Sequence, residues 1–306
     1  MIYLLVEEYW FLGFRSSGKG RFGMRTAIVT DTNCGITAAL AEELGVHLIP
    51  MPFFIGGETY YEGKDITFEF FFQKMREGVE VSTSQPSPEA VTGLWEELLK
   101  DHDAVLHFAM SSGLSGTCQT ATALAQEYGG RVQVVDDHRI SATLLQSIRN
   151  ARTLVDQGKT AQEIKRILEE ERYEASIYIA LSTLDNLKKS GRITAAGAAM
   201  AAVLNLKPVL QIQGGKLDAY KKVRGFNQAK KTMIEALSKD LDSRFKETNV
   251  QLFVAYSGAD PEVGEKWKAE VEMAFPGRTV ECYPLPLSIC CHTGEGGVGI
   301  GCAKKH

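Results

Sequence analysis

The feature that most restricts the fold of this chain is the regular alternation of strand-like and helix-like segments between Arg25 and Glu171. Apolar runs of strand length, such as Thr26–Thr30, are followed by segments with helical spacing and helix-start signals. One of these helices is expected to begin after Thr37 and to end at Gly45. Strands joined by crossover helices pair in parallel, so the pattern predicts a largely parallel sheet covered on both faces.

A loop rich in hydroxyl groups follows the strand predicted over Ala104–Met110, and a helix is expected to begin at Ser115. Serine and glycine alternate in this loop: Ser111, Ser112, Gly113, Ser115 and Gly116. Ligands of α/β sheets bind at the carboxyl ends of the strands, where the N-termini of helices attract anions. The loop therefore indicates an anion site, although Ser115 may equally cap a helix while the glycines only turn the chain.

A second loop of this kind, Ser82–Gln85, contains Thr83 and Ser84 and precedes a helix capped by Ser87, with Pro88 at its first position. Because both loops end just before a helix, they are candidates to converge at one edge of a sheet.

The pattern changes after Glu171. A strand over Tyr173–Ser182 is followed by a hairpin with Gly214 and Gly215 at its turn, and further strands follow. We therefore expect an N-terminal α/β domain over residues 24–171 and a C-terminal α/β domain with a mixed or antiparallel sheet over 172–306. Residues 1–23 are expected to form a poorly ordered extension, because their order of apolar and basic residues does not fit a signal peptide.

Composition excludes several classes of function. The chain has 306 residues, 44% of them hydrophobic and 24% charged, with a net charge of −4, so it offers no basic field for nucleic acid. Its longest apolar stretch, Ala195–Leu206, is too short to cross a bilayer, and no stable membrane insertion is expected. The six cysteines form no CxxC pair, which is typical of reduced thiols in a cytoplasmic protein.

Two further segments carry candidate site residues. His292 begins a loop with four nearby glycines, where the backbone can approach a ligand and the imidazole can donate a hydrogen bond; a structural role remains open. Arg192 follows a Ser-Gly turn at the start of a helix rich in alanine and glycine, which could line a slot for a thin apolar chain or pack tightly. Cys290, Cys291, His292 and Cys302 are not expected to hold a metal, because adjacent cysteines seldom reach one tetrahedral ion.

Taken together, these stretches resemble the DegV family of bacterial proteins. The similar motifs run from Met24 to the end of the chain in the expected order: TDTNCG at Thr30, TSQPS at Thr83, SSGLSGT at Ser111, the turn from Asp137 to Ser141, LDNLKKSGRI at Leu184, LNLKPVL at Leu204 and HTGEGGVGIG at His292. The resemblance implies a two-domain α/β fold with the ligand bound between the domains.

The resemblance also implies a function. Members of this family bind a long-chain fatty acid, and many serve as the substrate-carrying subunit of a fatty acid kinase. The residues that match the carboxylate site are Thr83, Ser84, Ser112, Ser115 and His292, and Arg192 matches an arginine associated with phosphoryl transfer on the partner kinase. No cofactor is implied, and the chain contains no P-loop of its own, so the ATP-dependent step is assigned to a second protein. Two positions depart from the family pattern: Gly35 replaces an acidic residue, and Glu295 replaces a proline, which puts a carboxylate beside the expected one.

Two other functions remain open at this point. A serine hydrolase would use Ser115 and His292, although the sequence around Ser115 misses the GxSxG motif by one position. A carbonyl-binding subunit similar to dihydroxyacetone kinases would attach a small keto-sugar to His292.

Overall fold

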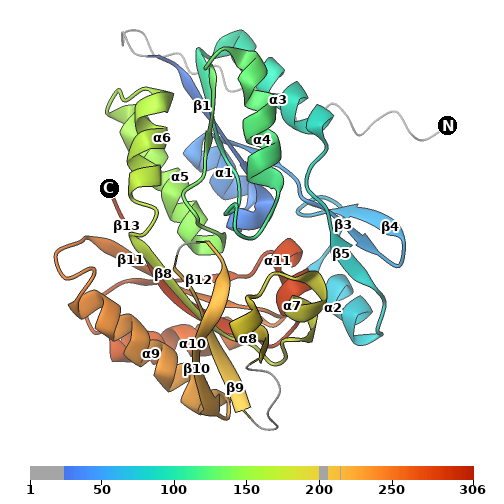
Figure 1. Cartoon of the computed structure of the whole chain (residues 1–306), viewed down its shortest axis with the longest axis vertical. Coiled ribbons are helices and arrows are strands. Elements are labelled where there is room, and N and C mark those ends of the chain that lie inside the picture. The colour runs from blue at the N-terminus through green and yellow to red at the C-terminus, as the bar shows by residue number, and fades with distance from the viewer. Residues whose placement is uncertain (1–23, 200–205, 214) are drawn as a thin grey trace.

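The computed structural model describes residues 24–199, 206–213 and 215–306, and its elements form two stacked halves (Figure 1). The half drawn at the top of Figure 1 contains a parallel sheet, and the lower half contains a larger mixed sheet. The domain boundary predicted near Glu171 falls in the connection between α6 (Ala161–Glu170) and β8 (Ala175–Ala180). The predicted N-terminal extension and Gly214 of the predicted hairpin turn lie outside the described residues.

A four-stranded parallel sheet forms the centre of the upper half, in the order β2-β1-β6-β7. Its strands are β1 (Thr26–Asp31), β2 (Val46–Ile49), β6 (Ala104–Phe108) and β7 (Val132–Val135). The helices that cover it are α1 (Ala38–Leu44), α3 (Pro88–Asp101), α4 (Thr117–Ala125), α5 (Ser141–Asp156) and α6, with two short 3-10 turns, η1 (Thr32–Cys34) and η2 (Gln126–Tyr128).

Strand β1 is buried along its whole length because helices cover both faces of this sheet. Ile28 packs in one core with residues of α5 and α6, whereas Ala27 and Val29 pack in a second core with residues of α3 and α4. The predicted two-sided parallel layer is confirmed.

The helix-start signals act largely as predicted. The side chain of Thr37 accepts a hydrogen bond from the N–H of Leu40 at the start of α1, and Gly45 ends that helix with φ of 61°. Helix α4 begins at Thr117, two residues later than predicted. The reason is that residues 111–115 close a turn of their own, in which the N–H groups of Leu114 and Ser115 donate to the carbonyl of Ser111.

A small antiparallel sheet projects from the upper half, in the order β4-β3-β5, with α2 (Phe68–Arg76) beside it. Its strands are β3 (Pro52–Ile55), β4 (Glu58–Tyr61) and β5 (Val81–Thr83). Phe53, Phe71 and Phe72 are fully buried and pack in a core that includes Leu181 and Leu285 of the C-terminal half. This small sheet therefore joins the two halves rather than extending the parallel sheet.

The lower half contains a six-stranded mixed sheet, in the order β10-β9-β8-β13-β11-β12. The prediction of a mixed or antiparallel sheet is confirmed. Its strands are β8, β9 (Leu206–Ile212), β10 (Leu217–Arg224), β11 (Val250–Tyr256), β12 (Val280–Pro284) and β13 (Val298–Lys304). Strands β11 and β12 pair in parallel, and the other pairings are antiparallel.

The two faces of this sheet have different partners. Helices α9 (Phe226–Asp242) and α10 (Pro261–Ala274) cover one face, where Tyr178 and Ala180 of β8 join their core. Ile177 and Ile179 alternate with them and point to the opposite face, which belongs to the core shared between the halves.

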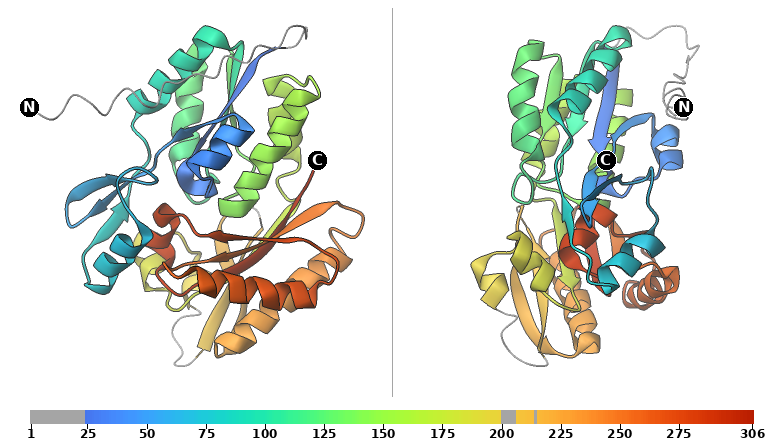
Figure 2. Two further views of the ribbon diagram at one scale, coloured as in Figure 1. Left: turned by 180° about the vertical axis from the view of Figure 1, so that it is seen from behind. Right: turned by 90° about the vertical axis from the view of Figure 1, so that its right-hand side faces the viewer.

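Two short helices, α7 (Asp185–Ser190) and α11 (Leu287–Thr293), complete the junction between the halves, and α8 (Ala195–Ala199) contacts β10. Helix α11 contacts α7, β5 and η1, and both views of Figure 2 show it (red) between the upper and lower halves. Near the end of the chain, Lys304 forms an ion pair of 2.6 Å with Glu171, and Nε2 of His306 lies 2.8 Å from the same carboxylate. None of the helices within the described ranges has the length and apolar character needed to span a bilayer.

Candidate ligand-binding site

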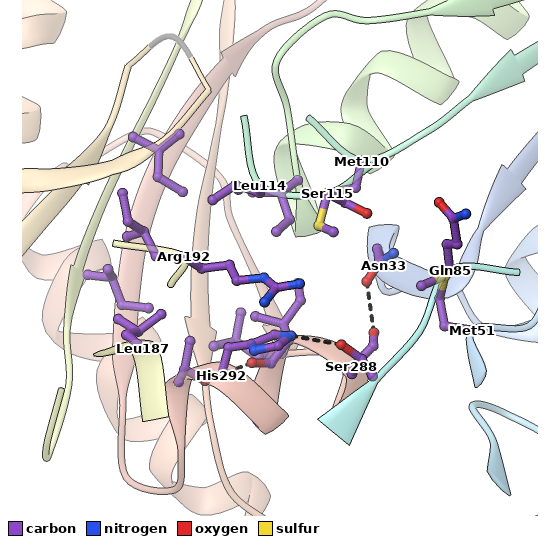
Figure 3. A pocket seen from close by; sticks show the side chains of 18 of the residues that line it. Asn33, Met51, Gln85, Met110, Leu114, Ser115, Leu187, Arg192, Ser288 and His292 are labelled. Carbon is purple, nitrogen blue, oxygen red and sulfur yellow. Dashed lines mark hydrogen bonds between the residues drawn. The ribbon is translucent and has the colours of Figure 1, made fainter. Parts of the chain in front are cut away.

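A cavity of about 240 Å³ lies between the two halves (Figure 3). Most of its wall is apolar and comes from both sides of the junction: Met110, Ile140, Ile177, Ile179, Ile212, Leu285 and Ile289. Isoleucine and leucine side chains have no hydrogen-bonding groups, so this wall suits a hydrocarbon rather than a polar ligand.

Polar side chains gather at one part of the cavity. Thr83 is the last residue of β5, Ser115 lies in the loop before α4, and His292 lies in the last turn of α11. The two hydroxyl-rich loops therefore meet at the cavity as expected. They reach it from different sheets, however, because β5 belongs to the small sheet and β6 to the parallel one.

Thr83 and His292 contact each other directly, with 2.9 Å between Oγ1 and Nε2. Burial, together with the positive charge of Arg192, lowers the pKa of His292 to about 4. The imidazole is therefore neutral at pH 7 and has one N–H to donate. A neutral imidazole next to a hydroxyl can donate hydrogen bonds to an anionic head group. Because the ring is uncharged, the empty site does not contain an unpaired buried charge.

The hydroxyl of Ser115 is fixed by the start of α4. Its Oγ lies 2.8 Å from Oγ1 of Thr117 and accepts a hydrogen bond of 3.2 Å from the N–H of Thr117. Ser115 lines the cavity but is not the N-cap of α4. Gly116 takes that position, and Ser115 holds the helix start through the N–H of Thr117. The loop of Thr83 is held nearby, because the hydroxyl of Thr120 donates to Oε1 of Gln85 over 3.0 Å.

Of the other predicted carboxylate ligands, Ser84 lines the cavity next to Thr83. Ser112 lines a shallower depression instead, which shares Leu114, Ser115, Gly116 and Arg192 with the cavity. The backbone N–H of Ser112 donates to Asp136 over 3.2 Å, which fixes the loop at that point.

Arg192 is exposed and lies where the cavity and the depression meet, with its side chain directed toward the cavity (Figure 3). It follows α7, which Gly191 ends in the left-handed conformation with φ of 68°. The guanidinium donates to the carbonyl of Ser190. Its remaining N–H groups can reach an anion placed outside the polar mouth.

Glu295 does not add an uncompensated charge beside His292. Its carboxylate forms an ion pair of 2.7 Å with Arg76, the last residue of α2. The carboxylate introduced at this departure from the family pattern is therefore balanced by a cation from the N-terminal half.

Several polar residues at the site have little or no signal in the sequence. Asn33 and Ser288 line the cavity, and behind them lies the buried carboxylate of Glu62. Asn33 had a weak signal, because it follows β1 at the carboxyl edge of the sheet and belongs to the TDTNCG motif. Glu62 had none, since its segment reads only as a turn between extended pieces.

Cys290, two residues before His292, has a local partner. The thiol of Cys290 donates to the carbonyl of Leu285 over 3.3 Å, and burial raises the pKa of this thiol to about 12. Among the residues that the structure describes, no group of three or more His, Cys, Asp or Glu side chains is arranged to hold a metal ion.

The fold and the site define an α/β protein of two halves that encloses an apolar cavity with a polar mouth. The sequence model of the DegV family, described as a family of uncharacterised proteins, matches residues 25–305. The chain belongs to the DegV family.

Known proteins agree with this assignment. A DegV domain-containing protein of Deinococcus radiodurans is 31% identical over 278 residues, which cover 90% of this chain and 98% of that protein. Among solved structures, a DegV family protein from Thermus thermophilus described as fatty-acid-binding is 31% identical, with a TM-score of 0.83 over 92% of this chain and 100% of that one. DegV of Bacillus subtilis, also described as a fatty-acid-binding protein, is 27% identical with a TM-score of 0.80 over the same shares of the two chains.

Proposed function

We propose that this chain binds a long-chain fatty acid, with the acyl chain in the cavity and the carboxylate at the polar mouth. The observation that carries this proposal is the contact between Thr83 and His292 in the wall of a largely apolar cavity. Similar solved proteins described as fatty-acid-binding support it. In this proposal Thr83, Ser115 and His292 bind the carboxylate directly, while Ser84 and Ser112 flank it.

The acyl tail and the carboxylate head group contribute differently to the free energy of binding. Each buried methylene contributes roughly 0.8 kcal/mol, so an acyl chain of about 15 methylenes contributes on the order of 12 kcal/mol as an upper bound. Association itself costs about 4 to 15 kcal/mol. The tail therefore supplies most of the affinity, and the hydrogen bonds at the mouth mainly prevent the carboxylate from being desolvated without partners.

The purified protein tests this proposal directly. Extraction with organic solvent followed by mass spectrometry should identify a co-purified fatty acid, or the emptied protein should take up added palmitate or oleate. A protein that contains no lipid and takes up neither fatty acid would overturn the proposal.

We further propose that the bound fatty acid is presented to an ATP-dependent kinase for acyl-phosphate formation. Arg192 is exposed beside the polar mouth, where it can contact a phosphoryl group while the tail stays buried. The hydrolase alternative receives less support, because the hydroxyl of Ser115 pairs with Thr117 and the imidazole of His292 pairs with Thr83.

A further inference from the structure

Glu62 follows β4 directly and is only 8% exposed. Its Oε2 accepts hydrogen bonds from the hydroxyl of Thr32 over 2.9 Å and from that of Ser288 over 2.7 Å. Its Oε1 accepts from the backbone N–H groups of Leu287 and, over 3.3 Å, Ser288. One carboxylate of the N-terminal half therefore accepts three hydrogen bonds from the first turn of α11, and Oγ of Ser288 also donates to Oδ1 of Asn33 over 2.8 Å.

The N–H groups of Leu287 and Ser288, which donate to Glu62, have no partner within α11, because the first turn of a helix leaves its amides without a carbonyl to bond to. A carboxylate is the strongest acceptor available for such amides and for two hydroxyls at once. Within the described part of the chain, no lysine or arginine forms an ion pair with Glu62. Its oxygens thus face the donors of α11 rather than a basic side chain.

Helix α11 transmits this contact to the head-group site. Ser288 and His292 are four residues apart, so they lie on the same face of the helix, and both line the cavity. A shift at Ser288 would therefore move His292 relative to Thr83, which is fixed in the small sheet by its pairing with Phe53.

We propose that Glu62 is a positioning residue for fatty-acid recognition, which holds α11 so that His292 meets Thr83 at the carboxylate site. This inference rests on the proposed function. Glu62 does not touch the ligand itself; it acts through α11, and its role is to give the cavity its preference for an acid over a neutral head group.

The test compares an acid with the matching alcohol. Binding of palmitate and of hexadecanol is measured for the wild type and for Glu62→Gln, a replacement of the same shape that has lost one acceptor oxygen. Palmitate affinity should fall about tenfold, the equivalent of one lost hydrogen bond of about 1.4 kcal/mol, while hexadecanol affinity stays within about twofold. A purely structural role would instead weaken both ligands to the same extent.

Two further variants complete the design. Asp240→Asn is the matched control, since Asp240 is also a buried carboxylate that accepts from Ser176 and Tyr178, but it lies on α9 away from the cavity. It should keep the preference for palmitate. In the His292→Ala background, Glu62→Gln should cause no additional loss of palmitate affinity, because the two residues act through the same contact.

The outcomes separate this inference from the proposed function. If the wild type binds neither ligand, the proposed function fails. If the wild type prefers palmitate and Glu62→Gln keeps that preference, or if the losses from Glu62→Gln and His292→Ala add, the role of Glu62 is overturned. If Glu62→Gln does not fold, Ser288→Ala is measured instead, because it removes one of the four donors to Glu62. This variant should then show a smaller loss of the preference for palmitate.

Discussion

The hydroxyl of Thr83 and the imidazole of His292 lie 2.9 Å apart although 209 positions separate them in the chain. Thr83 comes from the small antiparallel sheet and His292 from the short helix α11. The proposed head-group site therefore forms only when the two halves are packed together. Each half alone supplies a hydroxyl or an imidazole, but not the pair.

Replacing Thr83 by valine should weaken palmitate binding by about 1 to 2 kcal/mol while the fold stays intact. Valine keeps the shape of the side chain and its preference for a strand, but it cannot bond to His292 or to a carboxylate. Titration calorimetry with palmitate measures the loss. Ser82→Ala, at the exposed neighbouring position of β5, is the control and should bind as the wild type does. Wild-type affinity in Thr83→Val would contradict the assignment of the carboxylate site.

Ser115 and Arg192 should have separable effects. Ser115→Ala removes a donor from the mouth and should reduce fatty-acid affinity itself. Arg192→Ala should leave binding nearly unchanged and abolish acyl-phosphate formation in the presence of a cognate kinase. Lys189→Ala, at another exposed basic residue of the same region, serves as the control for charge. Equal losses of binding in the Ser115 and Arg192 variants would show that this division is wrong.

Fatty-acid affinity should increase as the pH falls from 8 to 6. The pKa of His292 is lowered to about 4 in the empty site, and a carboxylate placed beside the ring raises it. The complex then holds more protons than the free protein, so binding takes up protons and lower pH favours it. Calorimetry in buffers with different ionisation enthalpies measures the uptake, and His292→Asn should remove it. Proton release by the wild type would contradict this prediction.

Glu62 should make the stability of the fold depend on pH in a way that glutamine does not. Burial raises the pKa of Glu62 from 4.5 to about 7, while its hydrogen bonds lower it in part. Between these two values the folded state keeps a proton that the unfolded state has released. Stability from this group is therefore present below pH 4.5 and is lost as the pH rises to about 7.

Urea unfolding of the wild type and of Glu62→Gln at several pH values isolates this effect. The free energy of unfolding of the wild type minus that of the variant should fall by up to about 3 kcal/mol between pH 4.5 and 7, and stay level above. Titrations of Asp31, His107 and His292 occur in both proteins and cancel in the difference. A difference that rises with pH would refute the environment assigned to Glu62.

The ion pair between Arg76 and Glu295 should protect the head-group site from repulsion. Arg76→Ala leaves the carboxylate of Glu295 unpaired next to His292 and should reduce palmitate affinity modestly, by at most about 1 kcal/mol, since both side chains are partly exposed. The loss should shrink at high salt and disappear when Glu295→Gln is added. A loss that persists in the double variant would mean that Arg76 acts in another way.

The parallel sheet could be predicted from sequence because its signals are local. Helices α1 and α3 begin after the capping residues Thr37 and Ser87, and β1 reads as a buried strand on its own. Hydrophobic periodicity and helix caps depend on only a few neighbouring residues, so they can be interpreted without knowing the rest of the chain.

The candidate site depends on contacts between distant segments, which local patterns do not contain. Residue patterns alone placed Thr83 and Ser115 at strand ends, but not on different sheets, and only the family resemblance grouped them with His292. Glu62 could not be found, because its function comes from amides of α11 that are 225 or more positions away. A buried carboxylate in a turn segment has no sequence signature that separates it from a solvated one.

Strand β13 is the last element of the chain and lies between β8 and β11, in the interior of the six-stranded sheet. The mixed sheet is therefore incomplete until β13 is in place, whereas every strand of the parallel sheet lies before residue 136. Loss of β13 would divide the mixed sheet into two separate pieces, β10-β9-β8 and β11-β12. A truncation that removes this strand should therefore cost far more stability than the loss of an edge strand of the same length.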